Sequence, residues 1–145
     1  MDKQTILKEP LGFYLDRAFN SLVARLNVAL DALGAGINHS QFIIVRTLDA
    51  HDGLSQNDIA RKLHRDPAAV SRSVKVLIDK GIIERTVLNG CKYGLSLTDK
   101  GSSIIPMMSE AIISVTEEAL KGIGDSEYDN GIRFLTSIYN NTERE

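Results

Sequence analysis

Apolar residues recur three or four positions apart over much of the chain, which is the spacing of one helix face. The first such stripe runs from Leu11 to Leu33 and predicts a long helix, which the following glycines end. A second stripe begins after Thr98, which can cap it, and continues for about 25 residues. Pro106 should kink that helix, because it removes one backbone hydrogen bond. A shorter stripe after Gly124 predicts a last helix.

Helix-start signals divide the segment between the two long stripes. Asn38 is followed three residues later by Gln41, and Ser55 is followed at the same spacing by Asp58. A short polar residue followed at that distance by a side chain that can reach back is typical of a capped helix N-terminus. We therefore expect a second helix after Asn38 and a third, short helix that ends near Leu63.

The fourth predicted helix begins at Asp66-Pro67. Asp66 can cap it, and Pro67 suits the first helical position, because the backbone donor that it lacks would have no partner there. The helix should run to about Lys80, where Gly81 ends it.

Two runs rich in β-forming residues, 82–87 and 93–97, then flank Asn89-Gly90, a pair strongly favoured in two-residue hairpin turns. The order of elements predicts a mainly α fold with a small β-hairpin wing, the winged helix-turn-helix. We expect a single domain over residues 1–145, with a winged helix-turn-helix lobe at about 37–98 and long dimerisation helices at 10–36 and 99–143.

The composition fits a folded domain with its positive charge in the middle of the chain. Of 145 residues, 43% are apolar, which suffices for a core, and no apolar run approaches the length that spans a bilayer. A single cysteine allows no internal disulfide and favours a reducing, cytoplasmic location. Segment 61–92 holds eight Lys and Arg against three acidic residues, so it carries +5 in a chain of net −2. This distribution favours nucleic-acid phosphates as its partner, with a solvated charged surface as the alternative.

The helix after Asp66 has two distinct faces. Its branched apolar residues share one side, while Ser71, Arg72 and Lys75 lie on the other, with small residues nearest the helix start. Such a face can enter a major groove, which is about 12 Å wide. Arg72 suits a bidentate bond to guanine, Ser71 can serve several bases, and Lys75 offers a point charge. The candidate DNA-binding residues, including phosphate contacts on the preceding helix and cations beside the hairpin turn, are Ser55, Gln56, Asn57, Arg65, Ala68, Ala69, Ser71, Arg72, Lys75, Arg85 and Lys92.

The apolar stripes on the long helices exceed what one small core can cover. Part of them should therefore be buried across a two-fold interface between two copies of the chain. Two recognition helices would then address half-sites about one helical turn (~10 bp) apart, which predicts a palindromic operator. The candidate dimerisation residues are Leu15, Leu22, Leu26, Ile112, Val115, Ile132, Leu135 and Tyr139.

Together these features resemble the MarR (multiple antibiotic resistance regulator) family of bacterial transcription regulators over nearly the whole chain. The resemblance implies a homodimer in which the first helix and the last two helices of each chain interleave, and two winged lobes that read an inverted repeat in double-stranded DNA. It implies a regulator, here expected to be a repressor, for which a small lipophilic or phenolic effector is a candidate ligand. The resemblance rests on Asn38-His39-Ser40-Gln41, Leu54–Ala60 with Leu63, Asp66–Arg72, Leu77–Arg85 and Leu95–Gly101.

The expected wing departs from the family pattern. Family members usually carry an acid-x-Arg pattern before the second strand, whereas the short segment 88–93 contains neither Asp nor Arg. Lys92 can supply only part of the charge of that arginine. We therefore predict that Arg72→Ala weakens operator binding much more than Lys92→Ala.

Other chemistry has less support in the sequence. Cys91 beside Lys92 could be a redox-sensing thiol, because a neighbouring cation favours the thiolate, but an ordinary thiol is the simpler interpretation. His39, His51 and His64 fall on different predicted elements without the spacing of a metal site, and neither a metal nor a cofactor is expected. No nucleophile–base motif or phosphate-binding glycine loop appears, so we expect no enzyme. The alternative function is a winged helix that docks another protein, because a fold alone does not determine a function.

Overall fold

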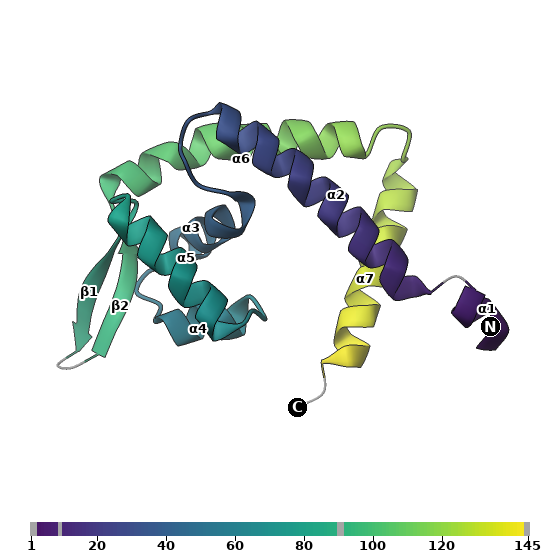
Figure 1. Ribbon diagram of the computed structural model, residues 1–145, viewed down its shortest axis with the longest axis horizontal. Helices are drawn as coiled ribbons and strands as arrows, with labels where there is room; N and C mark the ends of the chain where they lie inside the picture. The colour runs from purple at the N-terminus through teal and green to yellow at the C-terminus, as the bar shows by residue number, and fades with distance from the viewer. Residues whose placement is uncertain (1–2, 9, 90–91, 144–145) are drawn as a thin grey trace.

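The computed structural model describes residues 3–8, 10–89 and 92–143. The elements in order are α1 (Lys3–Lys8), α2 (Leu11–Ala32), α3 (His39–Ala50), α4 (Gln56–Lys62), α5 (Pro67–Asp79), β1 (Ile83–Asn89), β2 (Lys92–Leu97), α6 (Asp99–Ala119) and α7 (Asp125–Thr142). Helix α6 runs across the molecule and is crossed by α2 (Figure 1). Helix α7 descends from the C-terminal end of α6, while α3, α4, α5 and the hairpin form a lobe under its N-terminal end.

The predicted fold class is confirmed, and the predicted capping boxes are present. The side chain of Asn38 accepts a hydrogen bond from the Gln41 amide at 2.9 Å, and the Gln41 side chain accepts one from the Asn38 amide at 3.0 Å. Ser55 and Asp58 form the same reciprocal pair at the start of α4. Each box satisfies two backbone donors that a helix end leaves without partners, which explains why both helices begin where the sequence predicts.

Two helical details differ from the expectations. Helix α1 was not predicted, because its six residues carry no apolar stripe long enough to indicate a helix. Helix α6 ends at Ala119 and is shorter than expected, because Leu120 already has the conformation of a C-cap and Gly122 turns the chain with a φ of +86°. Pro106 lies inside α6, and the kink expected there stays a prediction.

The hairpin is confirmed, but its predicted turn is displaced. Strands β1 and β2 pair antiparallel, with Val87 opposite Tyr93 and Asn89 opposite Lys92, and the register shifts between Val87 and Asn89. Asn89 is therefore the last residue of β1 and not the first residue of the turn, as Asn89-Gly90 had suggested. Residues 90–91, which include the candidate redox thiol Cys91, lie outside the described residues.

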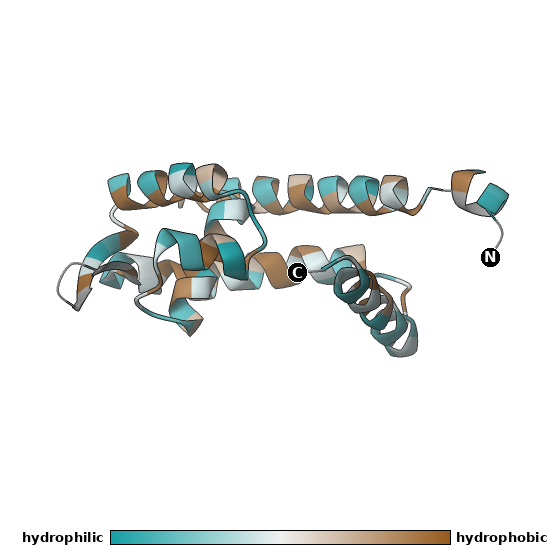
Figure 2. Cartoon of the chain, turned by 90° about the horizontal axis from the view of Figure 1, so that it is seen from below, coloured by the Kyte–Doolittle hydropathy of each residue, from teal (hydrophilic) through white to brown (hydrophobic). Residues whose placement is uncertain are grey.

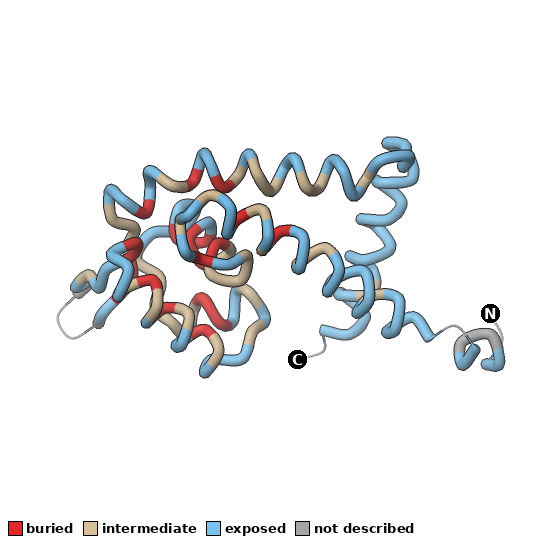
Figure 3. The backbone as a smooth tube through the Cα atoms, turned by 45° about the horizontal axis from the view of Figure 1, so that its top comes forward, coloured by how far each residue is buried: buried red, intermediate tan, exposed pale blue. Residues whose placement is uncertain are grey.

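One core joins the lobe to the adjoining ends of α2 and α6. Figure 3 shows the buried residues gathered there, whereas α7 and the outer halves of α2 and α6 are mostly exposed. In Figure 2 the apolar side of α2 faces the rest of the molecule. The described helices include none that combines the length and apolar content needed to cross a membrane. The fully buried side chains include Leu30, Ile44, Leu48, Ile59, Leu77, Ile82, Ile83 and Met108.

The predicted dimerisation residues differ in how far the single chain covers them. Leu26 is 3% exposed and belongs to the core of this chain, so it has no surface left for a partner. The other residues on α2 and α6 are half-buried, and those on α7 are exposed. The available apolar surface therefore lies along α7 and the outer parts of α2 and α6.

Helix α7 also contacts the lobe within the same chain. The hydroxyl of Tyr139 lies 2.5 Å from Nε2 of His64, and Glu143 Oε1 lies 3.0 Å from Nδ1 of the same ring. His64 occupies the turn between α4 and α5 with a left-handed φ of +48°. The end of α7 is thus joined to the turn that orients α5.

Candidate nucleic-acid interface

Helix α5 is held in one rotational setting by its cap and its core face. The carboxylate of Asp66 accepts a hydrogen bond from the Ala69 amide at 2.8 Å, and Pro67 occupies the first turn. Val70 and Val74 are buried in the lobe together with Leu77. Because these side chains face inward, the opposite face of the helix is left to solvent, as the sequence predicted.

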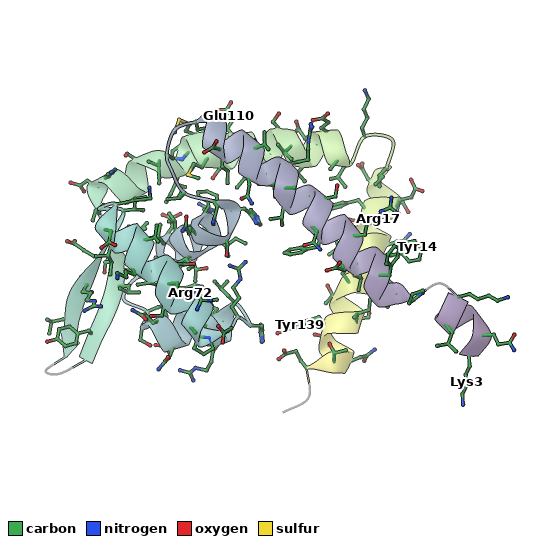
Figure 4. All side chains as sticks on the ribbon, viewed as in Figure 1. Lys3, Tyr14, Arg17, Arg72, Glu110 and Tyr139 are labelled. Carbon is green, nitrogen blue, oxygen red and sulfur yellow. The ribbon has the colours of Figure 1, made fainter. Side chains whose placement is uncertain are left out.

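The exposed face of α5 borders a groove of about 780 Å³ between this helix and β1. Ser71, Arg72 and Lys75 line it from α5, Arg85 lines it from β1, and Gln56 lines it from the start of α4. Figure 4 shows Arg72 on the lobe, on the helix that lies between the hairpin and α4. The structure thus brings five of the predicted DNA-binding residues to one concave surface.

The groove carries exposed positive charge with some acidic neighbours. Arg72, Lys75 and Arg85 are exposed, and none of the three forms an ion pair with a residue in the described part of the chain. Asp79 and Glu84 lie at the end of the groove near the base of the hairpin. Three exposed cations on one surface suit a polyanion, and the carboxylates of Asp79 and Glu84 disfavour its binding at their end of the groove.

Arg65 lies elsewhere, and its side chain already has partners. It is half-buried and donates hydrogen bonds to the hydroxyl and the carbonyl oxygen of Ser40, at 2.5 and 3.2 Å. These bonds tie the turn before α5 to the start of α3. Arg65 was predicted to bind DNA, and that role stays a prediction, while its observed hydrogen bonds stabilise the lobe. Burial, with a smaller effect of the Arg65 charge, also holds the pKa of His39 below its usual value.

The remaining predicted residues are divided among three places. The Ser55 hydroxyl donates to the Asp58 carboxylate at 2.6 Å within the α4 cap, and these bonds to Ser55 lower the pKa of Asp58. Asn57 is exposed and lies on the Arg65 side of α4. Ala68 is exposed and Ala69 half-buried in the first turn of α5. Lys92 begins β2, but its side chain lies outside the described residues.

Gln56, predicted to hold phosphate, lines both the groove beside α5 and a second cleft next to the hairpin, and Arg85 lines both as well. Val87 and Tyr93 form an exposed apolar pair on the hairpin that was not predicted from the sequence. The alternation of β1 and β2 contained the signal for this pair, but using it requires the strand register.

No group of three side chains that could hold a metal ion occurs among residues 3–8, 10–89 and 92–143. His39 begins α3, His51 follows its last turn, and His64 lies in the turn before α5. The three imidazoles therefore belong to three separate places in the lobe.

The comparisons with known proteins agree with this geometry. Residues 37–89 match the model of the MarR family. The chain is 28% identical over 110 residues to the HTH-type transcriptional repressor Rv2887 of Mycobacterium tuberculosis, which covers 74% of this chain and 77% of that protein. The matched segment begins just before α3 and ends with β1, so it contains the helix-turn-helix and the first strand of the wing.

Solved structures show the same fold over almost the whole chain. The crystal structure of CouR from Rhodococcus jostii RHA1, bound to p-coumaroyl-CoA, superposes with a TM-score of 0.81 at 21% identity and covers 96% of this chain and 98% of its own. The MepR–DNA complex of S. aureus gives a TM-score of 0.81 at 21% identity, with coverage of 94% and 99%. The long helices that flank the lobe therefore belong to the same architecture. This chain therefore contains a MarR family domain at residues 37–89 and shares its fold with these solved structures over almost its whole length.

Proposed function

We propose that this chain is a sequence-specific DNA-binding transcriptional repressor that binds a palindromic operator as a homodimer. The observation that carries the proposal is the groove beside α5, where Ser71, Arg72 and Lys75 lie together with Gln56 and Arg85. A helix presented in this way fits the major groove, and the cations around it fit the flanking phosphates. The similarity to Rv2887, which is named a transcriptional repressor, and to MepR, whose structure contains DNA, supports the same function.

The residues divide into two roles in this proposal. Arg72 and Ser71 read base edges, because they are exposed near the N-terminal half of a fixed helix. Lys75, Arg85 and Lys92 contact phosphates, which fix the register without reading sequence.

The exposed apolar residues on the helices outside the lobe support dimerisation. Ile132, Leu135 and Tyr139 lie along one side of α7 and are each nearly half exposed. A second copy that covers this stripe, together with the outer parts of α2 and α6, would place two α5 helices on one operator. A small lipophilic or phenolic effector is the proposed ligand of this regulator, and the p-coumaroyl-CoA in the CouR structure supports a ligand of that kind.

The decisive experiment is selection of bound sequences from a random pool of double-stranded DNA, followed by affinity measurements over a range of salt concentrations. We expect a palindrome to be enriched and its affinity to fall steeply with salt, because bound Lys and Arg release counterions. Absence of any enriched palindrome would favour the protein-docking function instead.

On the selected operator, Arg72→Ala should weaken binding much more than Lys92→Ala. A good bidentate arginine–guanine contact contributes about 1 to 3 kcal/mol of discrimination, whereas one phosphate contact on the wing contributes less. Titration of a fluorescent operator with each variant measures the two losses. Equal losses would refute this ranking of helix over wing.

A further inference from the structure

The end of α7 meets the lobe at one histidine. The Tyr139 hydroxyl lies 2.5 Å from Nε2 of His64, and a carboxylate oxygen of Glu143 lies 3.0 Å from Nδ1 of the same ring. The rings of Tyr139 and His64 also pack edge to face, with their centroids 5.1 Å apart. Figure 4 shows Tyr139 on the side of α7 that faces the lobe. Both nitrogens of this imidazole therefore have a partner at the end of α7.

The hydrogen bonds of this contact suit both protonation states of His64. In the neutral ring, Nε2 accepts from the Tyr139 hydroxyl and Nδ1–H donates to the Glu143 carboxylate. In the protonated ring, Nε2–H would donate to the Tyr139 oxygen instead, and the bond to Glu143 would become charge-assisted. The contact is thus suited to be a fixed link and not a pH switch.

His64 lies where such a link acts on the recognition helix. It belongs to the turn between α4 and α5, where it has a left-handed φ of +48°, and Asp66 caps α5 two residues later. The same turn is tied to α3, because Arg65 donates hydrogen bonds to Ser40. A movement of this turn would therefore move the N-terminal half of α5, which carries Arg72.

The link at His64 closes a ring of elements. The lobe lies under the N-terminal end of α6, whereas α7 descends from the C-terminal end of the same helix (Figure 1). The core joins the lobe to α2 and α6 through residues such as Leu30 and Met108, but none of the described residues of α7 is buried. Without the link, the lobe would be held at one end only and could turn about that attachment.

In the proposed dimer, this ring determines where the two recognition helices lie. Leu135 and Tyr139 belong to the stripe that a second copy would cover, so α7 is part of the dimer body. The lobe carries α5. A rigid connection between α7 and the lobe therefore fixes the position of each α5 relative to the two-fold axis, and with it the separation of the half-sites that both helices can reach together.

We propose that Tyr139 and Glu143 are positioning residues for operator spacing. By holding His64, they make the dimer select DNA by the separation of its half-sites, while the residues of α5 select the bases. This inference rests on the proposed function. Each base pair added between the half-sites moves them about 3.4 Å apart and rotates them by about 35° relative to each other. A dimer with fixed lobes must then lose contacts or deform the DNA, whereas a dimer with loose lobes can follow the change.

The test measures affinity for operators that differ only in spacing. One or two base pairs are added or removed at the centre of the selected palindrome, and each operator is titrated with the full-length chain. The wild type should lose about tenfold in affinity when the spacing changes by one base pair, because one half-site is then poorly engaged. Tyr139→Phe and His64→Asn should lose only about threefold for the same change. Phe keeps the apolar ring of the stripe, and Asn tolerates a left-handed φ as His does.

Three further variants separate the link from the fold of α7. Tyr128→Phe is the matched control, because it makes the same substitution on the same helix, about three turns from the contact, and it should keep the wild-type spacing preference. Glu143→Gln retains an oxygen that accepts from Nδ1–H and should also stay close to the wild type. Tyr139→Phe combined with His64→Asn should tolerate spacing changes no better than His64→Asn alone, since both remove one link.

The possible outcomes distinguish this inference from the proposed function. A wild-type spacing preference in both Tyr139→Phe and His64→Asn would overturn the inference and leave the proposed function intact. An equal loss of affinity at every spacing would indicate a merely structural role and would also overturn it. Monomeric sedimentation of Tyr139→Phe would overturn it as well, because the hydroxyl would then act at the dimer interface. If the wild-type chain enriches no palindrome, the proposed function itself fails.

Discussion

Among single residues, Gly101 lies where α6 closely approaches the backbone of Ile82. A Cβ at this position would lie 2.1 Å from the carbonyl oxygen of Ile82, which also accepts a hydrogen bond from the Thr98 amide. Only a backbone shift could make room. We expect Gly101→Ala to lower the free energy of unfolding by about 2 kcal/mol, as overpacked sites do. Urea denaturation measures this, and the neighbouring exposed Ser102→Ala should stay within about 0.5 kcal/mol of the wild type. Similar losses in both variants would contradict the steric argument.

His39 links the stability of the lobe to pH. Burial, and secondly the Arg65 charge, lower its pKa from the usual 6.5, so the unfolded chain binds a proton more readily than the folded chain. The stability of the folded state is therefore unaffected by His39 protonation above pH 6.5, and it decreases as the pH falls from 6.5 toward the lowered pKa of the folded state. We expect the wild type to lose more stability than His39→Gln between about pH 7.5 and about pH 5.5 in urea denaturation. Parallel curves for the two proteins would show that this imidazole does not contribute.

At the scale of elements, helix starts could be predicted because capping is local. The donors and acceptors of each cap lie within three residues, so Asn38, Ser55 and Asp66 indicate helix boundaries without knowledge of the fold. The buried and exposed faces of α5 were predictable for the same reason, because residues three or four positions apart lie on the same side of a helix. These short-range rules account for most of the candidate DNA-binding groove.

The cap of α5 can be tested by separating its hydrogen bond from its charge. Asp66→Ala removes the acceptor for the Ala69 amide and should lower the free energy of unfolding by about 1 kcal/mol. Asp66→Asn retains an acceptor and should lose much less, since Asn caps nearly as well as Asp. Urea denaturation of both variants checks this. An Asn variant as unstable as the Ala variant would mean that the charge, and not the hydrogen bond, supports the helix.

The hairpin register could not be predicted in the same way. A two-residue turn at Asn89-Gly90 would place Tyr93 opposite Thr86, whereas the structure places it opposite Val87. A one-residue shift of register moves a side chain to the other face of a strand. With the turn misplaced by one residue, the pairing of Val87 with Tyr93 could not be predicted. Strand β2 also pairs at Leu95 with Leu54, about forty residues away in sequence, and no local pattern encodes such a contact.

At the scale of the whole molecule, the apolar stripe of α7 was evident from periodicity, but its surroundings were not. None of the described residues of α7 is buried in the single chain, and its end meets the lobe through Tyr139 and His64. That contact joins positions 75 residues apart. Tyr139, predicted only as a dimerisation residue, therefore also connects α7 to the turn before α5. A change in the packing of α7 would thus alter the contacts of the turn that precedes the recognition helix.

The stripe on α7 makes a prediction about assembly that the full-length chain can answer. Leu135 is 46% exposed in the single chain, and in the proposed dimer it would be covered, so Leu135→Glu would place a charge in an apolar interface without a partner. We expect the wild type to sediment as a dimer at micromolar concentration and Leu135→Glu to sediment as a monomer. The variant should also bind the palindrome no more tightly than a single half-site, because the two α5 helices are then no longer linked. Ser137→Glu, on the opposite side of α7, should remain a dimer with unchanged affinity. A monomeric wild type, or a Leu135→Glu variant that stays dimeric, would show that α7 does not form the interface.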